Sequence, residues 1–171
     1  MLSAIVLVAD AVSPEALSPE AIVRTLSSLV PCVVEGLVRD LTLATSSDIP
    51  LLREIADHAG CDIAVANTPA GLLAAGLASA RGDWILAIRA GYAPRSGFSE
   101  EIADVLDSGQ RRLHLARLRA EPDSLITRLA PSLAIVAGVV GARGGFTRNA
   151  RDLGALSRGA PTLRTRLRRV G

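Results

Sequence analysis

The segment "DWILAIRAGY", residues 83–92, contains a short apolar run that is followed directly by a charged side chain. Residues 84–88 are typical of a buried strand, Arg89 follows them directly, and Gly91 comes two residues later. In open α/β sheets, ligands bind at the carboxyl ends of the strands. An arginine there donates charge-assisted, often bidentate hydrogen bonds to phosphates or carboxylates. We therefore predict that Arg89 and Gly91 face a ligand site.

Carboxylates at two other predicted boundaries are further candidates. Asp10 ends the apolar run of residues 3–9, where it either contacts a ligand or caps the turn before Ser13. Asp48 lies two residues before Pro50, at the expected start of a helix. Its side chain either contacts a ligand or caps that helix, and capping explains the residue completely.

The histidines and cysteines do not form a catalytic or metal-binding pattern. His58 falls in the expected last turn of a helix, where an imidazole stabilises the terminal carbonyl groups. His114 lies on the polar side of an expected strand, and would act as a base only if that strand borders a cleft. Cys32 and Cys61 lack a CxxC pair or a histidine at metal spacing, so we expect buried thiols in a reducing compartment.

Alternating strand and helix patterns position these residues in the first half of the chain. Apolar runs typical of strands occupy residues 3–10, 40–44, 61–67 and 83–88, with helical patterns between them. Ser18 and Pro19 are expected to start the first helix, and Gly60 to end the second. The expected buried stripes are Leu17, Ile22, Val23, Leu26 and Leu29, then Leu51, Leu52, Ile55 and Ala59. This order predicts an α/β fold with a mostly parallel sheet and helices on both faces.

The pattern changes after residue 94. Residues 96–109 read as a capped helix, 111–120 as a half-exposed strand, 124–146 as helix-like, and 161–170 as a short basic amphipathic helix. No linker, repeat or low-complexity tract divides the chain. We therefore predict a single domain over residues 1–171.

The composition excludes several classes of protein. A chain of 171 residues that is 49% hydrophobic can bury one sizeable core. Aromatic residues make up only 2%, so stacking surfaces for nucleic acid, and a nucleic-acid partner, are not expected. The apolar run 133–142 is too short for a transmembrane segment, which needs about 20 residues. The first residues lack the basic region of a signal peptide, and we expect a cytoplasmic protein.

The carboxyl-terminal segment, residues 151–171, is basic. It carries one acid, Asp152, against the arginines at positions 151, 158, 164, 166, 168 and 169. Two interpretations are open for these arginines. They either contact anionic lipid headgroups at the inner face of the membrane, or form a solvated face or a contact with a second subunit in a homodimer.

The element order and four segments resemble glycosyltransferase family 2 with its GT-A fold. The segments are "AGCDIAVAN", "GLASARGDWILAIRAGYAPRSGF", "GARGGF" and "LRTRLRRVG", and their order and spacing cover nearly the whole chain. The resemblance implies a GT-A-like, Rossmann-type sheet. Residues 1–94 would form the nucleotide-binding half, and residues 95–171 the acceptor-side half with the basic C-terminal helix. A nucleotide-diphosphate sugar is the implied partner.

This sequence departs from the family at its three acidic positions. Active members use an acid for the nucleoside, an acidic motif for a divalent metal such as Mn or Mg, and a Glu-Asp pair as general base. Counting from the matched segments, these positions carry Thr45, then residues 89–91, then Gly159 and Ala160. For the first of them, a shifted alignment would place Asp40 or Asp48 there instead. A hard cation needs oxygen ligands, and neither Gly159 nor Ala160 can accept a proton. We therefore assign no metal ligand and no catalytic residue.

The resemblance leaves two functions open. In the first, the protein is a glycosyltransferase, metal-independent or impaired, in which Arg89 replaces the cation on the diphosphate. In the second, it is a non-catalytic GT-A domain that serves as a nucleotide sensor or as partner subunit of an active transferase. Arg89 would then be a solvated loop residue. The candidate nucleotide-sugar-binding residues are Asp10, Thr45, Asp48, Arg89 and Gly91.

Overall fold

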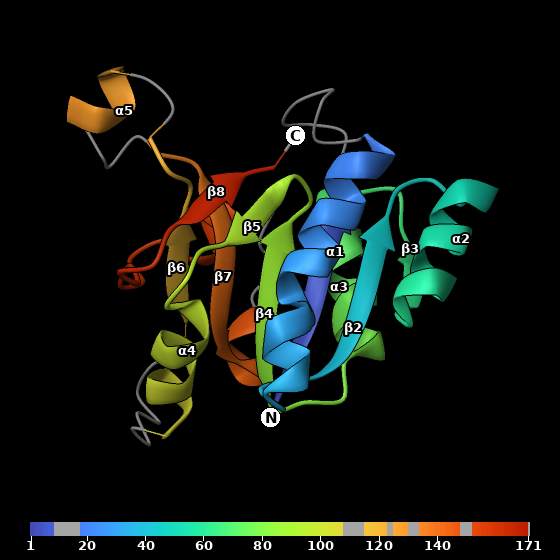
Figure 1. Cartoon of the computed structure of the whole chain (residues 1–171), viewed down its shortest axis with the longest axis horizontal. Helices are drawn as coiled ribbons and strands as arrows, with labels where there is room; N and C mark the ends of the chain where they lie inside the picture. The colour runs from blue at the N-terminus through green and yellow to red at the C-terminus, as the bar shows by residue number, and fades with distance from the viewer. Residues whose placement is uncertain (9–17, 108–114, 123–124, 130–133, 148–151, 171) are drawn as a thin grey trace.

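A six-stranded sheet with helices on both faces forms the core of the computed structural model (Figure 1). The structure describes residues 1–8, 18–107, 115–122, 125–129, 134–147 and 152–170. The strand order is β3 (Asp62–Val65), β2 (Val38–Thr45), β1 (Leu2–Val8), β4 (Trp84–Arg89), β7 (Val136–Ala142) and β6 (Ala116–Arg119). The first four are parallel, and β7 runs antiparallel to both β4 and β6. The predicted α/β fold with a mostly parallel sheet is confirmed.

Two helical layers cover the sheet. The layer drawn in front in Figure 1 contains α1 (Pro19–Val34), α2 (Pro50–Ala59) and α4 (Phe98–Asp107). The opposite face is covered by α3 (Pro69–Ser79), the 3-10 helix η3 (Arg143–Thr147) and α6 (Leu153–Leu156). Strand β1 is buried on both faces, because Ala4, Val6 and Val8 pack toward the α1 side, and Ile5 and Leu7 toward the α3 side. A continuous apolar run is what a central parallel strand requires.

The predicted helix boundaries of α1 and α2 are largely confirmed. The hydroxyl of Ser18 accepts a hydrogen bond from the backbone N–H of Ala21 at 3.1 Å, and Pro19 opens the first turn. Gly60 ends α2 with a left-handed φ of 64°. The expected buried stripes are only partly right, because Val23, Leu51 and Ala59 are exposed. Leu17 lies outside the described residues.

Two predicted helices in the second half are wrong. Much of the helix-like segment 124–146 is strand β7, preceded by the short α5 (Leu125–Leu129). A short apolar run does not distinguish a buried strand from a buried helix by periodicity. The predicted basic C-terminal helix contains β8 (Leu167–Arg169), which pairs antiparallel with β5 (Tyr92–Pro94). Leu163 and Leu167 mimic a helical spacing, but they belong to an extended segment.

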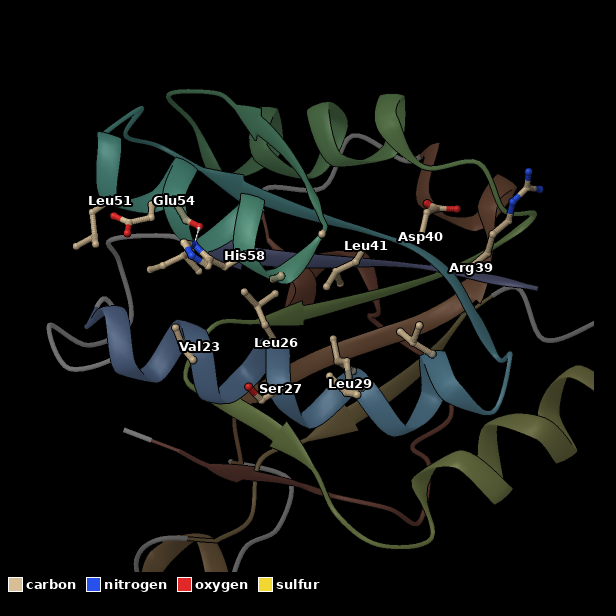
Figure 2. Close-up of a pocket in the computed structure, with 15 residues that line it drawn as sticks. Val23, Leu26, Ser27, Leu29, Arg39, Asp40, Leu41, Leu51, Glu54 and His58 are labelled. Atoms are coloured by element: carbon tan, nitrogen blue, oxygen red, sulfur yellow. Dashed lines mark hydrogen bonds between the residues drawn. The ribbon is translucent and has the colours of Figure 1, made fainter.

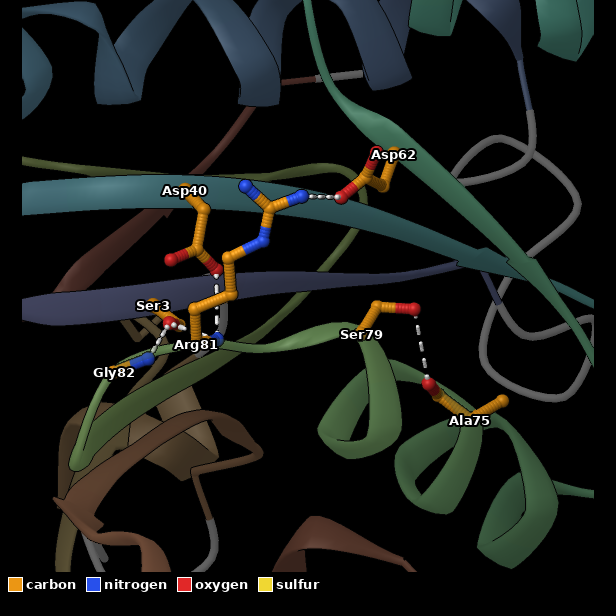
Figure 3. A network of polar contacts seen from close by, with 7 residues as sticks. All are labelled: Ser3, Asp40, Asp62, Ala75, Ser79, Arg81 and Gly82. Atoms are coloured by element: carbon orange, nitrogen blue, oxygen red, sulfur yellow. Dashed lines mark hydrogen bonds and ion pairs between the residues drawn. The ribbon is translucent and has the colours of Figure 1, made fainter.

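Polar contacts tie the amino edge of the sheet together (Figure 3). The hydroxyl of Ser3 accepts hydrogen bonds from the backbone N–H groups of Arg81 and Gly82, at 3.1 and 2.7 Å. A carboxylate oxygen of Asp40 accepts from the same N–H of Arg81 at 3.3 Å, and the Arg81 guanidinium lies 3.8 Å from Asp62. These contacts fix the turn that leads into β4, at the edge opposite Arg89.

Among the described residues, no helix is long and apolar enough to cross a membrane.

Candidate functional site

The carboxyl ends of β1, β2, β3 and β4 meet at one edge of the sheet because these strands are parallel. The chain adds β2 and β3 on one side of β1 and then crosses to add β4 on the other. This reversal is the topological switch point, where open α/β sheets bind their ligands. Arg89 ends β4 at this point, in register with Leu7 of β1.

Arg89 is half-buried, and its guanidinium is held by the backbone. Its Nε donates a hydrogen bond of 3.1 Å to the carbonyl oxygen of Val136, the first residue of β7. No described residue accepts a hydrogen bond from the two Nη atoms. Burial lowers the pKa of Arg89, and the charges of Asp152 and Tyr92 oppose that effect. The arrangement orients a cation whose two terminal nitrogens remain available to an anion.

Gly91 serves the backbone turn that follows β4. Its φ of 83° is in the left-handed region that favours glycine. Its N–H donates to the hydroxyl of Thr25 in α1, and its carbonyl oxygen accepts from the N–H of Val170, both at 2.9 Å. Gly91 is buried and both of its polar groups are occupied. Its contact with a nucleotide stays a prediction, whereas its structural role is explained.

Thr45 reaches the same edge but points to the other face of the sheet. Side chains alternate along a strand, so Thr45 lies on the side of Leu43, toward α1, and Arg89 on the side of Ala87, toward α3. Strand β1 separates β2 from β4, which places their backbones about 10 Å apart. Thr45 is 1% exposed, and its hydroxyl contacts the backbone N–H and carbonyl of Ser47. The structure therefore brings the two residues to one edge, but not to one face.

The expected capping role of Asp48 is wrong. The N-cap of α2 is Ile49, which makes no side-chain cap. Asp48 instead accepts hydrogen bonds from Nε and Nη2 of Arg53, at 2.6 and 2.5 Å. The hydrogen bond from Arg53 and its charge lower the pKa of Asp48. The carboxylate is thus paired within its own loop and helix.

Three other predicted positions have different outcomes. His58 lies in the last turn of α2, as expected, with Nδ1 2.8 Å from the carbonyl oxygen of Glu54. Asp10 and His114 lie outside the described residues. Their predicted roles stay predictions.

Two partners of Arg89 were not predicted from the sequence. Val136 acts through its backbone carbonyl, for which no side-chain pattern exists. Asp152 is the N-cap of α6, where its carboxylate accepts the N–H of Ala155 at 2.8 Å. An acid at the start of a helix is a recognisable N-cap pattern, but no local pattern indicates that α6 packs on the face of the sheet that carries Arg89.

The donor groups that the structure describes at this edge do not fit a divalent cation. Residues 89–91 supply one guanidinium and no side-chain oxygen. The described part of the chain contains no group of three or more His, Cys, Asp or Glu residues that could hold a metal ion. Gly159 and Ala160, the positions at which the family resemblance implies a general base, form the turn after α6. These residues therefore do not support a reaction step that depends on a bound metal ion.

The topology and the switch point define the chain as a protein with the GT-A glycosyltransferase fold. Similar solved structures include glucosyl-3-phosphoglycerate synthase from Mycobacterium tuberculosis in complex with phosphoglyceric acid, at 18% identity and a TM-score of 0.60, covering 91% of this chain and 64% of that one. A complex of the same synthase with Mn2+, UDP-glucose and phosphoglyceric acid has a TM-score of 0.61 at 18% identity, covering 93% and 68%.

These likenesses concern the fold and do not single out family 2. The chain spans about two thirds of the length of these neighbours, 64% and 68%. No protein-family model matches the sequence, and no curated protein matches it.

Proposed function

We propose that this protein binds a nucleotide-diphosphate sugar at the carboxyl edge of β1 to β4 and is a glycosyltransferase of the family 2 type that works without a metal ion or with impaired transfer. The observation that carries the proposal is Arg89, a half-buried cation at the switch point whose Nη atoms have no acceptor among the described residues. The structural neighbours support the ligand class, since they were solved with UDP, UDP-glucose and Mn2+.

The chemistry of the proposal follows from charge. Breaking the bond between a sugar and a nucleoside diphosphate leaves negative charge on the phosphate oxygens. Fixed positive charge aimed at those oxygens stabilises the departing group, whether it comes from a metal ion or from a guanidinium. Arg89 is pre-oriented by Val136, so little reorganisation is needed when the diphosphate arrives.

The lack of a proton-accepting side chain at positions 159 and 160 favours a second, non-catalytic function. Gly159 and Ala160 offer no side chain that can accept a proton, and transfer to a hydroxyl needs a base. A non-catalytic GT-A domain, acting as a nucleotide sensor or as partner subunit of an active transferase, would keep Arg89 and nucleotide binding without turnover. The two functions share the binding step and differ in sugar transfer.

Calorimetric titration of UDP and UDP-glucose tests the shared step. We expect binding in EDTA that Mn2+ does not strengthen, and a loss of about tenfold or more in affinity for Arg89→Ala, because a hydrogen-bonded charge is removed. Arg89→Lys should keep part of the affinity, since lysine retains the positive charge but not the planar guanidinium that can donate two parallel hydrogen bonds to a phosphate. Arg128→Ala, at an exposed arginine of α5, is the matched control. Absence of binding, or binding that requires Mn2+, would reject the proposal.

Release of UDP from UDP-glucose then separates the two functions. A glycosyltransferase releases UDP in the presence of an acceptor, or slowly to water, and Arg89→Ala reduces that rate. A sensor or partner subunit binds the nucleotide without releasing it from the sugar. Cytoplasmic location and contact of the C-terminal arginines with anionic lipid remain further proposals.

A further inference from the structure

An apolar groove lies between α1 and α2, on the face of the sheet away from Arg89 (Figure 2). It has a volume of about 600 Å³ and a floor of Leu26, Leu29 and Leu41. Val23, Val30 and Val33 of α1 form one wall, and Leu51, Ile55 and Ala59 of α2 form the other. No residue of the proposed nucleotide site lines it.

Exposed aliphatic side chains concentrate on this face. Ten large hydrophobic residues are exposed among the described residues, and six belong to α1 or to the start of α2: Val23, Val30, Val33, Val34, Ile49 and Leu51. Val34 is 81% exposed and Val30 53%. Single exposed hydrophobic residues are ordinary, but a contiguous apolar patch marks an interaction surface.

The exposed side of α1 has the spacing of a helix-pairing seam. Val23, Ser27, Val30 and Val34 follow one another at intervals of four, three and four residues. This spacing keeps one stripe of a helix against a partner helix. The buried stripe of α1, which includes Ile22, already packs on the sheet, so the seam is a second apolar face.

Charged residues at the two ends of α1 indicate which helix fits. Glu20 and Arg24 are exposed near its amino end, and Glu35 and Arg39 are exposed near or beyond its carboxyl end. No described residue forms an ion pair with any of the four. Figure 2 shows Val23 toward one end of the groove and Arg39 beyond the other.

We infer that this face binds a second copy of the chain, with the two α1 helices antiparallel about a two-fold axis between Leu29 and Val30 in sequence. That axis places Arg24 of one copy near the partner's Glu35, and Glu20 toward the end of the partner's α1 beside which Arg39 of β2 lies. Each charge meets its opposite, and the symmetry repeats both contacts. A parallel pair would instead place each charge beside its own kind. The aliphatic seams meet between these charges and cover both grooves.

The dimer is tested on the full chain by sedimentation equilibrium from about 1 to about 200 µM, because an interface of two helices per copy is at the small end of specific interfaces. We expect a reversible monomer–dimer equilibrium. Val30→Glu should raise the dissociation constant at least tenfold, since it buries an unpaired charge in the seam. Leu129→Glu, at an 87% exposed leucine of α5, should leave it unchanged. Circular dichroism confirms that each variant is folded.

Charge reversal tests the antiparallel arrangement. Arg24→Glu and Glu35→Arg should each weaken the dimer about threefold, and the double variant should restore it, because the reversed charges again face opposite partners. A monomer throughout the concentration range would overturn the inference, and so would a dimer insensitive to Val30→Glu. A double variant no stronger than the singles would overturn the antiparallel pairing. Nucleotide binding does not enter any of these outcomes.

Discussion

A guanidinium and a carboxylate-bound metal ion can each place positive charge on a diphosphate, but they need different neighbours. A hard cation needs several oxygen ligands from the protein, whereas Arg89 needs only one backbone carbonyl to fix its orientation. At the scale of single residues, the absence of side-chain oxygens at positions 89–91 is therefore compatible with diphosphate binding. No such replacement exists for the general base at positions 159 and 160, because neither glycine nor alanine has a side chain that can accept a proton.

The carboxylate of Glu101 connects two distant segments of the chain. Its two carboxylate oxygens accept the backbone N–H groups of Arg164 and Thr165, both at 2.8 Å, and so fasten α4 to the segment before β8. Partial burial alone would raise the pKa of Glu101, but the hydrogen bonds from Thr165 and Arg164, with the charge of Arg164, outweigh it and lower the pKa. We expect Glu101→Gln to lower the free energy of unfolding by about 1 kcal/mol at pH 7.

The pH dependence of that loss fixes its cause. A carboxylate whose pKa is lower in the folded state adds stability above its unfolded pKa of about 4.3, and this stability is lost as the pH falls through the folded value. Urea unfolding at pH 7 and at pH 3 should therefore show a clear difference between wild type and Glu101→Gln at pH 7 and a smaller one at pH 3. Equal differences at both pH values would show that the carboxylate charge is not involved.

At the scale of elements, α1 is coupled to the strand that carries Arg89. The hydroxyl of Thr25 donates to the carbonyl oxygen of Ala21 and accepts the N–H of Gly91, both at 2.9 Å, and Thr25 is fully buried. This one side chain connects the middle of α1 to the turn between β4 and β5.

Thr25→Val removes the hydroxyl with little change of shape. The buried N–H of Gly91 then loses its partner, and we expect a loss of about 1–3 kcal/mol in the free energy of unfolding. Chemical denaturation measures it, and Thr25→Ser, which keeps the hydroxyl, should retain most of the stability. If the valine variant were as stable as the serine variant, this hydrogen bond would not hold the turn.

Helix α3 approaches β1 closely at Gly76. A Cβ added to Gly76 would lie 2.5 Å from Cγ2 of Ile5, a fully buried residue of the central strand. Alanine is the better helix former by up to about 1 kcal/mol, yet we expect Gly76→Ala to destabilise the protein by about 1–3 kcal/mol through overpacking. The control is Gly144→Ala, where the added Cβ meets nothing within 4 Å. A more stable Gly76→Ala in thermal unfolding would contradict the close packing.

Elements with a local signal were predicted well. Ser18, Pro19 and Gly60 set the ends of their helices through contacts within a few residues, which a sequence shows directly. Strands β7 and β8 were missed because their partners are distant: β7 pairs with β4 and β6, and β8 with β5. Val23 and Leu51 lie at positions that helical periodicity predicts to be buried. Periodicity does not show whether another part of the chain covers them, and in this structure both are exposed.

At the scale of the whole molecule, one sheet joins the two predicted halves. Strands β6 and β7 from the second half continue the sheet beyond β4, so Arg89 lies between parallel strands on one side and an antiparallel strand on the other. The edge that carries Arg89 was predictable from the βαβ order. The distribution of Arg89 and Thr45 over opposite faces was not, because it depends on the register of two strands that do not touch each other.

The two surfaces proposed for the molecule lie on different parts of it. The α1/α2 face would bind a second copy, and the carboxyl edge of the sheet would bind a nucleotide diphosphate. Thr25 lies in α1 and contacts the turn after Arg89, so its hydroxyl is one link between the two surfaces.

The most direct measurement is a crystal structure of the protein grown with UDP and Mn2+ together. We expect the diphosphate at the carboxyl edge of β1 and β4, with its oxygens within hydrogen-bond distance of the Nη atoms of Arg89 and no metal ion between them. A divalent ion coordinated by protein side chains beside Gly91, or UDP bound away from Arg89, would contradict it.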